Sequence, residues 1–151
     1  MQIYTLQLGE LRANCYIVQT AENRCVAVDI GGDGRLLTEF LRMKKLNLSK
    51  ILLTHGHFDH TGGVEEVRKA TGAEVFIHED DVPMLSSESK SLHSSMSYRK
   101  FTPVTQYTAV TGDCYINDGD YEFRVLHTPG HSYGSVCYLV EDVMFSGDTI
   151  F

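Results

Sequence analysis

Residues 54–61 read Thr-His-Gly-His-Phe-Asp-His-Thr and place His55, His57, Asp59 and His60 within six positions. The preceding run, 50–54, is short and apolar, which predicts a strand buried on both faces. Side chains alternate on a strand and rotate by about 100° per residue on a helix, so neither element could aim all four side chains at one place. We therefore expect a metal-binding loop at the carboxyl end of this strand.

Two later segments end predicted strands in the same way. Residues 127–132 read His-Thr-Pro-Gly-His-Ser, where proline and glycine force a turn that presents His131. Residues 145–148 read Phe-Ser-Gly-Asp and present Asp148, whose carboxylate could bridge two cations. Imidazole and carboxylate groups suit Zn²⁺, and the same donors also suit Fe or Mn. Three strand ends thus supply six candidate ligands, which are His55, His57, Asp59, His60, His131 and Asp148.

Length and composition narrow the remaining choices. A chain of 151 residues fits one domain, 1–151, that is large enough to form its own core. The net charge of −7 offers no basic surface for nucleic acid, and no apolar stretch approaches the roughly 20 residues of a membrane span. The first ten residues alternate like a strand and lack a basic leader, so we expect a cytoplasmic protein. The four separated cysteines predict buried free thiols.

Periodicity predicts strands first, then helices, then strands. A helical pattern over 34–46 puts Leu36, Leu37, Phe40 and Leu41 on one stripe, with Asp33 as the candidate cap. A second helix is expected over 63–71, ended by Gly72, and a turn or short helix over 79–85. A hairpin turn is expected at 117–120. The predicted strands are 2–8, 14–19, 25–30, 50–54, 73–78, 114–116, 121–126, 135–140 and 143–147.

The other polar residues are interpreted more plainly. Residues 86–97 contain seven serines and no apolar period, which indicates a loop. The longer segment 86–100 is expected to be a solvated connector rather than a cover over the site. Single histidines and aspartates near turns are usually solvent-exposed or hydrogen-bonded, and we interpret His78, His93 and Asp113 in that way. His127 either supports the ligands or packs at the turn.

The sequence resembles the metallo-β-lactamase superfamily. Residues 55–60 match the H-x-H-x-D-H motif of that family, and 128–132 and 147–148 match its later ligand-bearing motifs. Residues 14–16 and 28–32 look like those of the small glyoxalase II-like members, the relatives of hydroxyacylglutathione hydrolase that cleave thioesters. The resemblance implies an α+β fold, the αββα sandwich.

The resemblance also implies roles for the six candidate ligands. His55, His57 and His131 would bind a first metal, Asp59 and His60 a second, and Asp148 would bridge them. The implied cofactor is one or two Zn²⁺, with Fe²⁺ or Mn²⁺ as alternatives. A metal-bound hydroxide would attack a small-molecule substrate such as a hydroxyacylglutathione thioester. When the second metal site is empty, Asp59 could also orient the water or accept a proton.

One departure from the family pattern concerns the C-terminus. The family places another histidine ligand well after the Asp148 motif, and this sequence ends at Phe151. We therefore expect a C-terminally truncated sandwich whose second metal site is short of one ligand. The strand 143–147 would then present an open edge, through which we expect the chain to form a homo-oligomer.

Three other interpretations stay open at this point. A mononuclear iron oxygenase similar to the persulfide dioxygenases would use His55, His131 and Asp148. Alternatively, the chain binds metal and catalyses nothing. Secreted β-lactamase activity is less favoured because the sequence shows no export signal, and flavodiiron chemistry is disfavoured by His57, where that group carries an acidic ligand.

Overall fold

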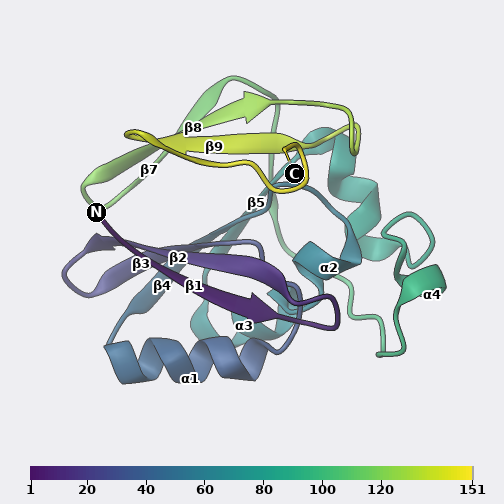
Figure 1. The fold of residues 1–151 in the computed structure, drawn as a ribbon, viewed down its shortest axis with the longest axis horizontal. Coiled ribbons are helices and arrows are strands. Elements are labelled where there is room, and N and C mark those ends of the chain that lie inside the picture. The colour runs from purple at the N-terminus through teal and green to yellow at the C-terminus, as the bar shows by residue number, and fades with distance from the viewer. Residues whose placement is uncertain (151) are drawn as a thin grey trace.

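The computed structural model describes residues 1–150, and Phe151 lies outside the described part. Two β-sheets are stacked face to face, and helices cover one outer face of the stack (Figure 1). The strands of the first sheet are β1 (Gln2–Leu8), β2 (Ala13–Ala21), β3 (Arg24–Val28), β4 (Asn47–Leu52), β5 (Glu74–His78) and β6 (Thr108–Val110). Those of the second are β7 (Cys114–Asp118), β8 (Tyr121–His127), β9 (Val136–Val140) and β10 (Val143–Phe145).

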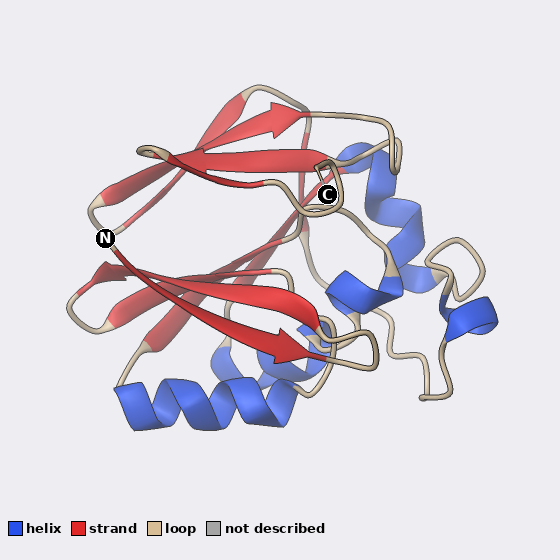
Figure 2. Ribbon diagram, in the orientation of Figure 1, coloured by secondary structure: helices blue, strands red, loops and turns tan. Residues whose placement is uncertain are grey.

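In the sequence, all the helices of the described residues fall in the connections between strands β3, β4, β5 and β6 of the first sheet. In space, two of them cover that sheet and the others lie at one end of the stack (Figure 2). They are α1 (Gly34–Lys44), α2 (Phe58–Thr61), α3 (Val64–Thr71), the 3₁₀ helix η1 (Glu79–Ser86) and α4 (His93–Met96). The two longest α-helices, α1 and α3, pack against the outer face of the first sheet. Among residues 1–150 the outer face of the second sheet carries no helix, so three of the four layers of the expected sandwich are present.

Alternation along the strands builds two separate cores. On β2 and β3, Ile17, Cys25 and Ala27 face the helices, whereas their neighbours Val18 and Val26 face the second sheet. A strand turns successive side chains to opposite faces, so β2 and β3 each contribute to both cores. The core between the sheets is completed by buried residues that include Leu52, Phe76, Phe123, Val136, Tyr138 and Phe145.

The sheet topology gathers strand ends at one edge. In the first sheet β1, β2 and β3 are antiparallel neighbours, and β3, β4, β5 and β6 run parallel. The carboxyl ends of β3, β4 and β5 therefore point the same way, which is where polar sites form in such sheets. The second sheet, in the order β10-β9-β8-β7, is antiparallel throughout. Its strands β8 and β10 end beside the same edge (Figure 1).

Several sequence-based expectations need correction. Asp33 precedes α1 with a left-handed backbone and makes no side-chain capping bond; its carboxylate instead accepts hydrogen bonds from Gly9 N and from Arg99. Leu36, expected on the buried stripe of that helix, is 56% exposed. The segment 86–97 is not wholly a loop because it contains α4. β6 was not predicted, since its three residues pair only with the distant β5.

The open edge and three of the four cysteines follow the expectations, whereas Cys114 is only half-buried. Cys15, Cys25, Cys114 and Cys137 are all free thiols, and burial raises the pKa of Cys25 to about 12 and the pKa of Cys15 further still. β10 is an edge strand that pairs only with β9 within residues 1–150. Self-association through it stays a prediction, which light scattering would test. Every helix among the described residues is too short or too polar to cross a membrane.

Candidate metal centre

The histidine cluster follows β4 and runs into a one-turn helix. His55 lies in the extended segment after the strand, His57 occupies the N-cap position of α2, and Asp59 and His60 lie within that helix. The expected loop is therefore half loop and half helix. The junction is tied to the second sheet by a hydrogen bond of 2.8 Å from Val136 N to Thr54 O. This bond brings the HTPGHS turn beside the cluster.

Three imidazoles form the first donor group, which consists of His55, His57 and His131. Nδ1 of His57 lies 3.0 Å from Nε2 of His131, and one ring nitrogen from each of the three residues lies within 4.8 Å of the others. The His55 ring is perpendicular to that of His57, with 4.9 Å between centroids. His55 and His57 are buried, and His131 is exposed at the rim. Three nitrogens therefore converge from two loops that are far apart in the sequence.

A second donor group shares His55 with the first. One atom each of His55, Asp59 and His60 lies within 4.8 Å of the others, and Nε2 of His60 is 3.4 Å from Oδ2 of Asp59. The two groups therefore lie side by side around one imidazole.

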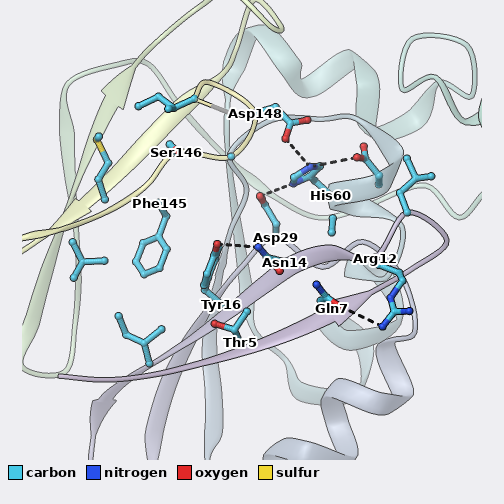
Figure 3. A pocket seen from close by; sticks show the side chains of 18 residues that line it. Thr5, Gln7, Arg12, Asn14, Tyr16, Asp29, His60, Phe145, Ser146 and Asp148 are labelled. Atoms are coloured by element: carbon cyan, nitrogen blue, oxygen red, sulfur yellow. Dashed lines mark hydrogen bonds and ion pairs between the residues drawn. The ribbon is translucent and has the colours of Figure 1, made fainter.

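Asp148 stands between the two groups. Its Oδ2 lies 3.1 Å from Nε2 of His131 and 3.5 Å from Nε2 of His55, whereas its Oδ1 lies 3.4 Å from Nε2 of His60. Figure 3 shows this carboxylate directed at His60, above the groove between β1 and β10. Each oxygen thus faces a different donor group, which is the arrangement that a bridging carboxylate requires.

Asp29 orients the second group, and sequence analysis did not single it out. Its Oδ2 accepts hydrogen bonds from Nδ1 of His60 at 2.8 Å and from the Thr54 hydroxyl at 2.7 Å. Because Nδ1 of His60 is held, Nε2 faces Asp59 and Asp148, and such carboxylate–imidazole contacts fix the tautomer of metal-binding histidines. The signal available in the sequence was an aspartate directly after a buried strand, within the family-like segment 28–32.

The two donor groups differ in the pKa of their histidines. Burial, together with the neighbouring His55 and His131, lowers the pKa of His57 to about 4, so this imidazole is neutral at pH 7. Burial also disfavours a charge on His60, but Asp29, Asp148 and Asp59 outweigh it and raise the pKa of His60 to about 12. The adjacent His55 and His60 rings hold the pKa of Asp148 far below its usual range.

The donor atoms fit a divalent cation. Nε2 of His55 is buried and makes no hydrogen bond within residues 1–150. A buried polar atom without a partner is costly, and nitrogen and oxygen lone pairs that face one another gain a partner when a cation lies between them. His55, His57 and His131 could hold one cation, and Asp59, His60 and Asp148 a second. All six residues predicted from the sequence are therefore brought together at this edge.

Comparison with known proteins identifies the family. Residues 8–151 match the sequence pattern of the metallo-beta-lactamase superfamily. The chain belongs to the metallo-beta-lactamase superfamily. This superfamily binds divalent metals, and its membership agrees with the resemblance that the histidine motif suggested.

Two relatives are hydrolases by name, and one of them is named a probable metallo-hydrolase. The probable metallo-hydrolase YqgX of Bacillus subtilis (strain 168) is 33% identical over 148 residues, which are 97% of this chain and 70% of the relative. The hydroxyacylglutathione hydrolase of Shewanella halifaxensis (strain HAW-EB4) is 31% identical, and the match covers 90% of this chain and 46% of that protein. The chain thus spans about half the length of the second relative.

Solved structures of the superfamily share the fold. The BLEG-1 B3 metallo-beta-lactamase superposes with a TM-score of 0.93 at 34% identity, over 99% of this chain and 73% of that one. The protein TTHA1623, crystallised in a di-iron-bound form, gives a TM-score of 0.83 at 30% identity, over 98% and 73% of the two chains. Both likenesses confirm the metallo-β-lactamase fold expected from the sequence.

The remaining histidines lie outside this superfamily site. His78 is buried and accepts a hydrogen bond from Asp80 N, and its ring stacks on that of His127 with centroids 4.0 Å apart and 11° between planes. Since lone pairs lie in the ring planes, these stacked rings do not direct them at a common point. His93 packs edge-on against Phe58 and Phe101, and its buried Nε2 has no partner within the described residues, contrary to expectation.

Proposed function

We propose that this superfamily member is a metal-dependent hydrolase that cleaves a thioester such as a hydroxyacylglutathione. The proposed ligands of one or two divalent cations are His55, His57, Asp59, His60, His131 and Asp148. The observation that carries the proposal is the position of Asp148, with one oxygen toward each donor group. Zn²⁺ suits these nitrogen and oxygen donors, and Fe²⁺ or Mn²⁺ suits them as well. The named relatives support the hydrolase class and suggest the thioester.

The site residues supply the positioning and a base. A bound cation of this kind lowers the pKa of water to about 7 and polarises a carbonyl oxygen. Asp59 lines the groove of about 650 Å³ between β1 and β10, beside the second donor group. Burial alone would raise the pKa of Asp59, but His60 and His55 lower it below its ordinary value, so the carboxylate is ionised at pH 7. When the second donor group holds no cation, it can therefore orient a water molecule or accept its proton.

The proposal is tested by metal content and thioester hydrolysis. Protein purified without added metal is assayed for zinc, iron and manganese per chain, and hydrolysis is followed by release of the free thiol of glutathione. We expect bound metal and hydrolysis in the native chain, and loss of both in His131→Ala. The matched control is His127→Ala, which removes an imidazole four residues away that makes none of the ligand contacts. Hydrolysis that survives in His131→Ala, or an inactive native chain loaded with metal, would refute the proposal.

A second substrate class has one observation in its favour. The BLEG-1 structure, at 34% identity and a TM-score of 0.93, is that of a B3 metallo-beta-lactamase. A β-lactam is also an acyl compound opened by water at its carbonyl, so the same donor groups could serve it. A chromogenic β-lactam assayed beside the thioester decides between them, because the better substrate has the higher kcat/KM.

A further inference from the structure

Asp81 connects the two loops that carry the first donor group. It lies on η1, directly after β5, and its side chain is fully buried, with 0% exposure. Its Oδ2 accepts hydrogen bonds from Gly56 N at 2.9 Å and from the Ser132 hydroxyl at 2.7 Å, and its Oδ1 accepts one from Gly134 N at 2.7 Å. One carboxylate thus binds the backbone between His55 and His57 and the turn that follows His131.

We propose that Asp81 is a positioning residue, which sets the distance between the His55-Gly56-His57 segment and His131. The proposal rests on the proposed metal-dependent function, and it concerns a residue that touches neither a cation nor a substrate. Nδ1 of His57 and Nε2 of His131 come within 3.0 Å although 74 residues separate them. The Asp81 bonds join the immediate neighbours of both histidines.

The 3₁₀ helix η1 holds the backbone of Asp81 in place. Leu85, four residues further on, is buried in the core under the helices, and Leu85 O accepts a hydrogen bond from Val104 N at 3.0 Å. The fit is tight as well. A Cβ placed on Gly134 would lie 2.6 Å from Oδ1 of Asp81, so this turn approaches the carboxylate closely only because the residue is glycine. η1, the segment 55–57 and the turn 132–134 therefore pack closely around the Asp81 carboxylate.

Chemistry explains why a carboxylate is needed at this position. All three partners are donors, and two of them share one oxygen. An asparagine has nearly the same shape, but its amide group must face either Gly134 N–H or the pair formed by Gly56 N–H and Ser132. At least one donor would then meet another donor. Asp81→Asn consequently changes the loop contacts while keeping the volume of the side chain.

A matched control is available at the other end of the stack. Asp118 is also buried, at 3% exposure, and also accepts hydrogen bonds from several elements, including Thr20 and Ser49. None of its partners adjoins a candidate ligand. Asp118→Asn therefore reports what the loss of a buried carboxylate does to folding alone.

The test measures Zn²⁺ affinity by competition with a chromophoric chelator in the native chain and in both variants. We expect Asp81→Asn to weaken binding about 10–100-fold, the usual effect of losing a partner that supports metal ligands, and Asp118→Asn to leave it within about twofold. Unchanged affinity in Asp81→Asn, or equal weakening in Asp118→Asn, would overturn the proposal. If Asp81→Asn does not fold, Ser132→Ala removes one of the three bonds and should weaken binding in the same direction, less strongly.

A metal-free measurement separates this proposal from the proposed function. The ring signals of His57 and His131 and the amide signals of Gly56 and Gly134 are compared by NMR in the metal-free chain. We expect them to shift in Asp81→Asn and to stay in place in Asp118→Asn. If the native chain binds none of Zn²⁺, Fe²⁺ and Mn²⁺, the proposed function fails, and the ring signals then decide the role of Asp81. Ring signals that stay in place in Asp81→Asn would refute it.

Discussion

The two ends of the sandwich each hold a cluster of polar side chains that includes a carboxylate, and the two clusters differ in which groups meet the carboxylate charge. At the amino ends of β3 and β4, Asp118 accepts hydrogen bonds from two hydroxyl groups and from two basic side chains, namely Thr20, Ser49, Arg24 and Lys50. Every oxygen there faces groups that carry their own protons. At the carboxyl ends, imidazoles and carboxylates face one another. The hydrogen bonds of the first cluster are complete without a ligand, whereas the second contains the buried Nε2 of His55, which makes no hydrogen bond within residues 1–150 and would gain a partner from a bound cation.

This difference predicts which end the fold depends on. The first cluster joins β7 of the second sheet to β2, β3 and β4 of the first. The second cluster lies on the loops that follow the strands and on the one-turn helix α2. The cluster around Asp118 therefore stabilises the stack of sheets, whereas the cluster around His55 is available to bind a ligand.

The largest effect is expected from removing the cation. A strong chelator should abolish hydrolysis completely and leave the far-ultraviolet circular dichroism unchanged, because two apolar cores hold the chain together. Small zinc domains behave differently, since they unfold without their metal. Unfolding of this chain on chelation would contradict the comparison, because it would show that the fold depends on the candidate metal centre.

Asp118→Asn should give the next largest effect, on stability alone. Lys50 would lose its charge partner at a site where its side chain is only 16% exposed, and removing one member of such a pair costs about 3 kcal/mol. Urea unfolding measures the change in the free energy of unfolding. The comparison predicts that the affinity for Zn²⁺ is retained, and a large loss of affinity would show that the two ends are coupled.

Asp29→Asn should act at the opposite end and on binding. The substitution weakens the hold on Nδ1 of His60, and contacts of this kind change metal affinity by about 10–100-fold. Competition titration with Zn²⁺ measures the effect. Asp33→Asn is the matched control, because its carboxylate binds Gly9 N and Arg99 and touches no candidate ligand. Equal losses in the two variants would count against a specific role for Asp29.

The sequence predicted the six candidate ligands because each lies in a local pattern, directly after an apolar strand or beside a proline or glycine turn. Asp29 also follows a buried strand directly, but the groups that it holds, on His60 and Thr54, lie 31 and 25 residues away. Asp81 lies on η1 and has no such pattern. Asp81 meets its partners 25, 51 and 53 residues away, and only the folded chain brings them together. β6 was missed for a related reason, since a parallel strand pairs with a distant partner and leaves no hairpin signal. Ligands that lie in local sequence patterns could be predicted, whereas residues and strands whose partners are distant in the sequence could not.

The smallest effect expected is a pH dependence. Burial alone would raise the pKa of Asp118, but Arg24, Lys50, Thr20 and Ser49 hold it well below its ordinary value. In acid the unfolded chain therefore binds a proton that the folded chain does not, and the stability from Asp118 is lost as the pH falls below about 4. The stability gap between the native chain and Asp118→Asn should narrow between pH 5 and pH 3, as followed by urea unfolding at several pH values. A constant gap would contradict this assignment.

The buried cysteines allow the opening of the helical layer to be measured by thiol labelling. Thiolate is the form that reacts with alkylating reagents, and burial keeps Cys15 and Cys25 protonated and out of contact with solvent. Both lie under the helices, in the layer that also holds Leu37 and Val67. The rate at which these two thiols become labelled under native conditions therefore records how often α1 and α3 lift from the sheet, with no probe added to the sequence.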